Sequence, residues 1–221
     1  MRRVVLLLIS FVCILTAHAQ YDRVKNWEEH FKQIHEKNRK EAPVTDCVLF
    51  IGSSTFRMWQ DIQSYFPDSK IVNNAFGGSY LSDLIYYFKD IVLPHNPRQV
   101  VIYEGDNDLC SSKTPEEFME DAVCLTRLIQ LHFPKTSIVF VSIKPSPNRN
   151  ISIRTKYKSA NNLLKAYADS HDGITYVSIW DQMLDDKGNP NKKYFLEDGL
   201  HMNKSGYEVW QKALMPVILT K

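Results

Sequence analysis

The sequence predicts an α/β protein of three layers, in which helices cover both faces of a central, mostly parallel sheet of five strands. Three features indicate this fold: five short apolar segments, amphipathic helical segments between them, and clusters of Gly, Ser, Asn and Asp directly after several of the strands. Strands that alternate with helices need crossover connections, which produce parallel sheets covered on both sides. No repeat, low-complexity tract or linker interrupts the pattern, so we expect one domain over residues 20–221.

The N-terminus resembles an export signal. Arg2 and Arg3 precede an apolar stretch over residues 4–15, and Ala17-His18-Ala19 fits the small-x-small cleavage rule. The apolar stretch is shorter than the ~20 residues that span a membrane. We therefore expect residues 1–19 to be a signal peptide cleaved before Gln20, a secreted or periplasmic mature protein and no stable membrane insertion, with an uncleaved anchor as the alternative.

The charge balance argues against one class of partner. The chain has 27 basic and 25 acidic residues, and removal of Arg2 and Arg3 with the leader makes the two numbers equal. A neutral protein without a basic block is not expected to bind nucleic acid. The oligomeric state stays open.

The cysteines do not predict a metal site. No paired C-x-x-C occurs, so a structural zinc is not expected. Three cysteines follow the leader, and Cys47, beside the first strand, is expected to be a small buried hydrophobic residue. A disulfide between Cys110 and Cys124 stays open.

The elements are expected in the following order. Apolar runs predict strands at residues 48–51, 70–75, 99–103, 137–143 and 174–179. Helical spacing of apolar residues predicts helices near residues 21–40, 59–66, 81–91, 115–132, 153–164 and 205–217. Thr114 with Glu117, and Ser205 with Glu208, have the spacing of capping boxes, and Pro115 suits a first helical position.

The candidate nucleophile is Ser54. It follows the buried strand Val48-Leu49-Phe50-Ile51 and Gly52, at the strand end where open α/β sheets place their chemistry. A serine hydroxyl is a weak nucleophile until a base accepts its proton. Taken alone, Gly-Ser-Ser is also common in ordinary loops.

The candidate base is His201, in the sequence Asp198-Gly199-Leu200-His201. A carboxylate three residues before a histidine can bind one imidazole nitrogen, which fixes the tautomer and leaves the other nitrogen for Ser54. The alternatives are a surface turn or half of a metal site.

Two further strand ends supply hydrogen-bond donors. Gly77 and Gly78 offer unshielded backbone amides, and Asn107 offers a side-chain amide. Donors from separate strand ends can converge on one developing oxyanion, although each segment alone is equally consistent with a turn.

Together these segments resemble the SGNH hydrolases, also called GDSL-like lipases and acylhydrolases. The four matching blocks span residues 48–210 and are listed here: Gly52-Ser53-Ser54, Asn74-Ala75-Phe76-Gly77-Gly78-Ser79, Gly105-Asp106-Asn107-Asp108 and Asp198-Gly199-Leu200-His201. Ser53 stands where the family usually has aspartate, a position outside the family's catalytic machinery, so the departure affects the choice of substrate more than the mechanism.

The resemblance implies a flavodoxin-like SGNH fold and a Ser54–His201–Asp198 triad. It also implies an oxyanion hole formed by the Ser54 amide, the Gly78 amide and the Asn107 side chain. The reaction would be two-step transfer of an acyl group from an ester to Ser54 and then to water, without metal or organic cofactor.

Several substrates fit this chemistry. An exported esterase that removes short acyl groups, especially O-acetyl groups on carbohydrates, is favoured by the leader and by the absence of an apolar lid in the sequence. A lysophospholipase or thioesterase, a carbohydrate-binding protein without activity, and a metal hydrolase remain alternatives.

Other residues near the strand ends attract attention. We expect Tyr80, Tyr103, Glu104 and Trp180 either to line the substrate cleft or to pack at its rim. Arg57 and Trp59 follow the nucleophile closely, and we expect both to pack a helix.

Overall fold

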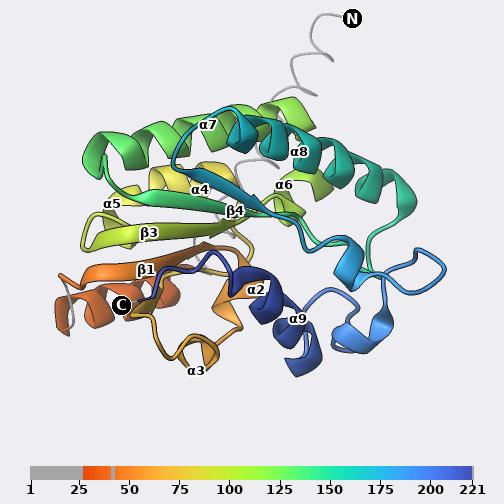
Figure 1. Cartoon of the computed structure of the whole chain (residues 1–221), viewed down its shortest axis with the longest axis horizontal. Coiled ribbons are helices and arrows are strands. Elements are labelled where there is room, and N and C mark those ends of the chain that lie inside the picture. Colours follow the sequence, from red (N-terminus) through yellow and green to blue (C-terminus); the bar gives the residue numbers. More distant parts are fainter. Residues whose placement is uncertain (1–26, 41–42, 221) are drawn as a thin grey trace, which may run out of the picture.

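The sheet of this protein has five strands, all parallel, in the order β2-β1-β3-β4-β5 (Figure 1). The computed structural model describes residues 27–40 and 43–220. The predicted signal peptide lies outside these residues. The strands are β1 (Thr45–Gly52), β2 (Ile71–Asn73), β3 (Asn96–Tyr103), β4 (Ser137–Val141) and β5 (Ile174–Val177). This order confirms the predicted flavodoxin-like arrangement.

Helices form a layer on each face of the sheet. They are α2 (Ser54–Arg57), α3 (Ile62–Tyr65), α4 (Leu81–Tyr86), α5 (Phe88–Ile91), α6 (Asp106–Cys110), α7 (Pro115–His132), α8 (Ile151–Asp169) and α9 (Lys204–Leu214). A further helix covers residues 27–40. Figure 1 shows α4, α7 and α8 on one side of the sheet and α2, α3 and α9 on the other.

The strands divide their side chains between these two layers. Side chains alternate along each strand, so successive residues of β1 enter different cores. Leu49 and Ile51 belong to the core that includes α4, α5, α7, α8 and the helix at residues 27–40. Val48 and Phe50 belong to the core beneath α2, α3 and α9. Both faces are buried, which explains why the strands are continuous apolar runs rather than alternating ones.

The fold places one sheet edge in position for chemistry. The β1–β2 connection passes on the α2/α3 face and the β2–β3 connection on the other, so the strand order reverses between β1 and β3. Open α/β sheets bind ligands at this switch point, beyond the carboxyl ends of the strands. Ser54 directly follows β1 and Asn107 follows β3. Gly52 lets the two strand ends meet, because a Cβ there would collide with the Tyr103 carbonyl.

The structure corrects two expected elements. The helix predicted over residues 81–91 is two short helices, α4 and α5, separated at Tyr87, whose ring stacks on Phe31 of the helix at residues 27–40. At Tyr87 the backbone departs from helical geometry, with φ −92° and ψ 15°. The capping box predicted at Ser205 and Glu208 is wrong, because α9 begins earlier and the Asn203 side chain caps it by accepting from the Gly206 amide. The box at Thr114 and Glu117 is confirmed.

All three described cysteines are free thiols. Cys47 is fully buried, as expected, whereas Cys110 and Cys124 are exposed and unbridged. Among the described residues, no helix combines the length and apolar character needed to cross a bilayer.

Candidate active site

The three predicted triad residues meet above the carboxyl end of the sheet. His201 Nε2 lies 3.0 Å from Ser54 Oγ, and His201 Nδ1 lies 2.6 Å from Asp198 Oδ2. Although 147 residues separate Ser54 from His201, the loop before α9 returns to the end of β1. The histidine can therefore accept the serine proton while the aspartate holds its other nitrogen.

Hydrogen bonds within the loop hold Asp198 and His201 in place. Asp198 Oδ1 accepts hydrogen bonds from the amides of Leu200 and His201, at 2.8 Å and 2.9 Å. The Leu196 amide donates to the His201 carbonyl at 2.8 Å, which closes the loop. The spacing of three residues thus serves a tight turn in which one carboxylate orients both the backbone and the imidazole.

Asp198 is an ionised group at neutral pH. Partial burial opposes ionisation, but the hydrogen bonds from the His201 ring and from the two backbone amides lower the pKa of Asp198 to about 2. An ionised Asp198 stabilises the imidazolium that forms when His201 takes the serine proton.

The residue after the nucleophile is fixed from two sides. The Thr55 carbonyl accepts from the Tyr207 hydroxyl at 2.8 Å, and Thr55 Oγ1 accepts from Lys144 Nζ at 3.1 Å. Lys144 is 1% exposed and also binds Asp106 at 2.9 Å. These buried contacts hold the start of α2, and hence Ser54, against the ends of β3 and β4.

Asp106 is the charged partner that makes this burial of lysine tolerable. Burial alone would raise its pKa, but the ion pairs with Lys144 and Arg149 lower the pKa of Asp106 to about 2. Its Oδ1 lies 2.7 Å from Arg149 Nη2 and also accepts from the Tyr157 hydroxyl. A buried charge with such partners is far less costly than an isolated one.

Two backbone amides are available to donate hydrogen bonds to an oxyanion. In the described part of the chain, neither the Ser54 amide nor the Gly78 amide donates to another group. Both residues line one cleft of about 480 Å³ together with Asn107 and His201. The geometry therefore brings together the donors predicted for the oxyanion hole.

The third donor, Asn107, is already engaged. Its Nδ2 donates to Ser53 Oγ at 2.7 Å and to the Ser79 carbonyl at 3.0 Å, which uses both amide protons. Ser53, which the resemblance placed outside the machinery, thus contacts the oxyanion asparagine directly. The sequence signal for this contact is weak: it is only that the Ser53 hydroxyl can accept a hydrogen bond from an amide.

A buried carboxyl supports this arrangement from below. Ser79 Oγ hydrogen bonds to Glu104 Oε1 and, at 3.0 Å, to the Phe76 carbonyl. Burial, followed by the nearby Asp108 carboxylate, raises the pKa of Glu104 well above its ordinary range. The raised pKa favours the neutral acid form of Glu104, whose own proton can serve the contact with Ser79.

The cleft contains residues that the sequence did not indicate. Its lining consists of Trp27, His30, Ser54, Arg57, Gly77, Gly78, Asn107, Leu200 and His201. Trp27 and His30 come from the helix at residues 27–40, where a helical pattern predicts packing and gives no sign of a site. Trp27 Nε1 donates to the Gly77 carbonyl at 2.7 Å.

Four candidate residues do not line the cleft, and one residue expected to pack a helix does. Tyr80, Tyr103, Glu104 and Trp180 are absent from its lining, and Tyr103 and Glu104 are buried in the interior. Arg57 is exposed and lines the cleft, whereas Trp59 is fully buried in the core, as expected. Within the residues that the structure describes, no three His, Cys, Asp or Glu side chains form a metal-binding cluster.

A serine nucleophile, a histidine held by an ionised aspartate, and free amides facing the same cleft define a hydrolase that cleaves esters through an acyl-enzyme. The sequence profile of the GDSL-like Lipase/Acylhydrolase family matches residues 51–209. The chain belongs to this family.

Solved structures share the fold. A Streptococcus pneumoniae protein whose name refers to platelet activating factor superimposes with a TM-score of 0.77 at 22% identity, covering 90% of this chain and 98% of its own. For an acylhydrolase from Bacteroides fragilis, the TM-score is 0.73 at 22% identity, with 84% and 93% covered. An acetyl-xylooligosaccharide esterase from Geobacillus superimposes with a TM-score of 0.63 at 16% identity, with 77% and 93% covered. At these identities the likeness establishes the fold.

One curated relative is similar in sequence. The N-acylneuraminate cytidylyltransferase of Escherichia coli O18:K1:H7 is 25% identical over 217 residues, which cover 95% of this chain. The chain spans 49% of that relative's length.

Proposed function

We propose that this family member is an exported esterase that removes short acyl groups, and above all O-acetyl groups, from carbohydrates. The observation that carries the proposal is the cleft at Ser54. It is open and its lining is mixed, with the polar side chains of His30, Arg57 and Asn107 beside the apolar side chains of Trp27 and Leu200. Such a site accommodates a small acyl group beside a hydrated alcohol such as a sugar.

The reaction follows from the contacts described above. His201 takes the Ser54 proton as Oγ attacks the ester carbonyl, and the free amides of Ser54 and Gly78 receive the oxyanion. His201 then gives the proton to the leaving alcohol. Water, deprotonated by the same histidine, cleaves the acyl-enzyme and releases the acid.

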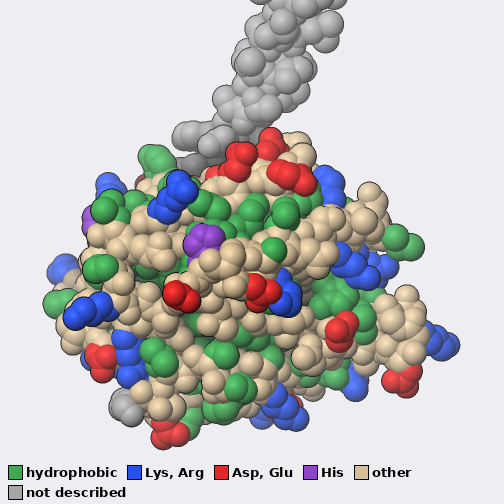
Figure 2. All heavy atoms as spheres, turned by 45° about the horizontal axis from the view of Figure 1, so that its top comes forward, with side chains coloured by type: hydrophobic (Ala, Val, Ile, Leu, Met, Phe, Trp, Pro, Cys, Tyr) green, Lys and Arg blue, Asp and Glu red, His purple; other side chains and the backbone are tan. Residues whose placement is uncertain are grey.

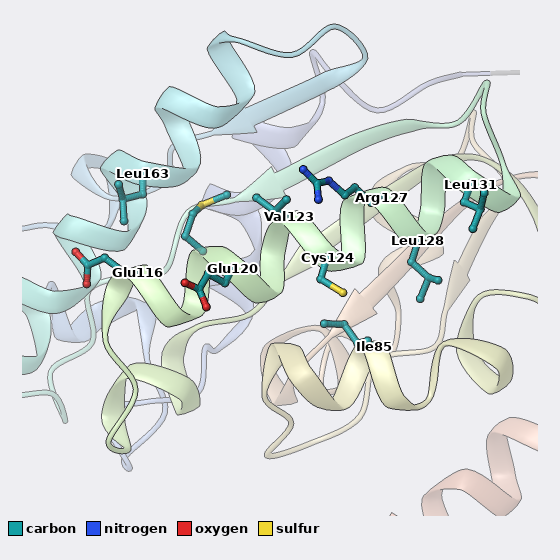
Figure 3. A pocket seen from close by; sticks show the side chains of 10 residues that line it. Ile85, Glu116, Glu120, Val123, Cys124, Arg127, Leu128, Leu131 and Leu163 are labelled. Carbon is teal, nitrogen blue, oxygen red and sulfur yellow. The ribbon is translucent and has the colours of Figure 1, made fainter.

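A second hollow in the molecule is better suited to lipid but lies away from the chemistry. It has a volume of about 770 Å³ and is lined mainly by α7, with Ile85 from α4 and Leu163 from α8 (Figure 3). Neither Ser54 nor His201 lines it. A long acyl chain bound there would not present its ester to the nucleophile, which disfavours a lysophospholipase.

The names of two similar proteins are consistent with a carbohydrate substrate. One solved neighbour is an acetyl-xylooligosaccharide esterase, and the curated relative is named for a sugar acid, N-acylneuraminate. These names support the choice of substrate class and nothing finer. Export is proposed from the leader in residues 1–19, and the N-terminal sequence of the mature protein, expected to begin at Gln20, tests it.

The deciding experiment compares acyl chain length and alcohol. We expect 4-nitrophenyl acetate to be hydrolysed faster than the octanoate and palmitate esters, and acetate to be released from acetylated polysaccharides. Ser54→Ala serves as the blank and should abolish both activities. A preference for palmitate would favour a lysophospholipase or thioesterase instead. If no ester is cleaved and a fluorophosphonate fails to label Ser54, the protein is a binding protein.

A further inference from the structure

The catalytic cleft carries positive charge that nothing in it neutralises. Of its nine lining residues, Arg57 has a permanent charge, and none is an aspartate or glutamate. Asp198 touches His201 from behind and is not part of the lining. Within residues 27–40 and 43–220, the Arg57 side chain forms no ion pair or hydrogen bond, and only its backbone amide donates, to the Ser53 carbonyl.

Arg57 is held beside the reacting atoms by the fold. It ends α2, the helix that begins at Ser54, so both side chains extend from the same short helix. Its Nε lies against Gly77, where a Cβ would come within 2.8 Å. Gly77 precedes the oxyanion residue Gly78, and the guanidinium is therefore next to the oxyanion loop.

The other titratable group nearby adds no negative charge. His30 Nε2 lies 3.0 Å from the Ala75 carbonyl, so this nitrogen carries a proton and donates it. Burial lowers the pKa of His30, and the Arg57 charge lowers it further. A neutral His30 leaves the guanidinium as the charged group on this side of the cleft.

From this placement we propose that Arg57 binds a carboxylate on the substrate, so that the preferred esters are O-acyl groups on acidic sugars. A guanidinium matches a carboxylate with two parallel hydrogen bonds, which gives orientation as well as charge. A cleft of one sign also attracts an oppositely charged substrate before it binds. The inference rests on the proposed esterase activity and specifies its substrate class.

The test uses two acetyl esters that differ in one group. Methyl 3-O-acetyl-glucuronoside has a carboxylate where methyl 3-O-acetyl-glucoside has a hydroxymethyl group, and the acetyl ester is the same. We expect kcat/KM for the glucuronoside to be about tenfold higher or more, which corresponds to ~1.4 kcal/mol. Arg57→Gln should bring the ratio close to one, and Arg57→Lys should retain part of it, since an ammonium keeps the charge and loses the bidentate geometry.

The control is Arg39→Gln, the same substitution at an exposed arginine near the end of the helix at residues 27–40. It should leave the ratio unchanged. Raising the ionic strength should reduce the wild-type preference, because salt screens a solvent-accessible ion pair.

Three outcomes would overturn the inference. The wild type shows no preference, the preference survives Arg57→Gln, or this substitution lowers kcat/KM equally for both esters, which assigns Arg57 to the oxyanion loop rather than to substrate selection. In each of these cases the neutral ester is still hydrolysed by the wild type and not by Ser54→Ala. Failure of the esterase proposal differs, since neither ester would then be cleaved above the Ser54→Ala blank.

Discussion

The two halves of the active site are built in opposite ways. On the proton-transfer side, the side chains of Asp198 and His201 are 43% and 25% exposed, and they sit on a loop that precedes α9. On the oxyanion side, Ser53, Ser79 and Glu104 are each no more than 2% exposed. Ser53 and Ser79 accept from the Asn107 amide, and Glu104 hydrogen bonds to Ser79.

The contrast is sharpest between the two acids. Hydrogen bonds keep the partly exposed Asp198 ionised, with its pKa at about 2, whereas burial raises the pKa of Glu104 and favours its protonated form. The proton-transfer side needs a full charge to face the imidazolium, and the oxyanion side needs fixed neutral dipoles that do not repel a developing anion. Environment, rather than residue type, assigns these two roles.

The largest effect short of removing the nucleophile is expected from Asp198→Asn. The amide cannot stabilise the imidazolium and favours the wrong tautomer of His201, and in a serine-protease triad the same exchange lowers kcat by ~10⁴. Because the pKa of Asp198 is about 2, its carboxylate stays ionised at every pH above that value, so it cannot cause a loss of activity between pH 7 and pH 4. Steady-state kinetics on 4-nitrophenyl acetate provide the measurement.

Glu197→Gln is the matched control for this change. Glu197 is an exposed acid on the same loop and belongs to neither the triad nor the cleft lining. Its substitution should leave kcat unaltered. An Asp198→Asn enzyme within tenfold of the wild type would show that the loop orients His201 without its carboxylate.

A smaller effect is expected from Asn107→Ala, which removes the third predicted oxyanion donor, a side chain that has to release Ser53 or Ser79 to bind the oxyanion. Loss of one such donor costs ~10² to 10³ in kcat. Asn107→Asp keeps the shape of the side chain but cannot donate, so it should lose at least as much. If Asn107→Ala leaves kcat unchanged, the amides of Ser54 and Gly78 suffice to bind the oxyanion. The buried hydrogen bonds around Asn107 then have a purely structural role.

Ser53→Ala should have a more modest effect, because Ser53 acts through Asn107. A neutral hydrogen bond contributes ~0.5–1.5 kcal/mol, so we expect kcat to fall by about two- to tenfold with KM unchanged. A selective loss in kcat distinguishes positioning of the oxyanion donor from a change in substrate binding. A rise in kcat would contradict this role and would mean that Ser53 competes with the oxyanion for the Asn107 proton.

The sequence predicted those parts of the molecule that depend on local pattern. The strands are continuous apolar runs, and Ser54, Gly78 and Asn107 lie in the loops or helix starts shortly after three of them, so one parallel sheet was enough to place these residues at one edge. Asp198 and His201 share one turn, and the spacing of three residues indicated their pairing.

The remaining features depend on tertiary contacts that leave no periodic trace. Trp27 and His30 have the spacing of an ordinary amphipathic helix, and only the docking of that helix against Ala75 and Gly77 brings them to the cleft. Glu104 looked like a rim residue because it follows β3, yet the strand end is covered and the carboxyl is buried. At the break between α4 and α5, the Tyr87 ring stacks on Phe31 of a distant helix, and this contact also has no local sequence signal.

The smallest expected effect concerns stability and tests the neutral acid directly. Because the pKa of Glu104 is raised in the folded state, its contribution to stability is complete below the unfolded value of about 4.3 and is lost as the pH rises toward the folded value. Each pH unit in that interval costs the wild type about 1.4 kcal/mol. Glu104→Gln is neutral at every pH and escapes this cost. We therefore expect the free energy of unfolding of Glu104→Gln, measured with urea relative to the wild type, to be higher at pH 8 than at pH 5.

Glu120→Gln, at an exposed acid on α7, should show no such pH dependence. The comparison between pH values matters more than the stability at either one, because the glutamine also changes the hydrogen bond to Ser79. If the difference between Glu104→Gln and wild type were equal at pH 5 and pH 8, Glu104 would be ionised in the folded protein. A carboxylate would then lie beneath the loop that receives the oxyanion, and the contrast between the two halves of the site would not hold.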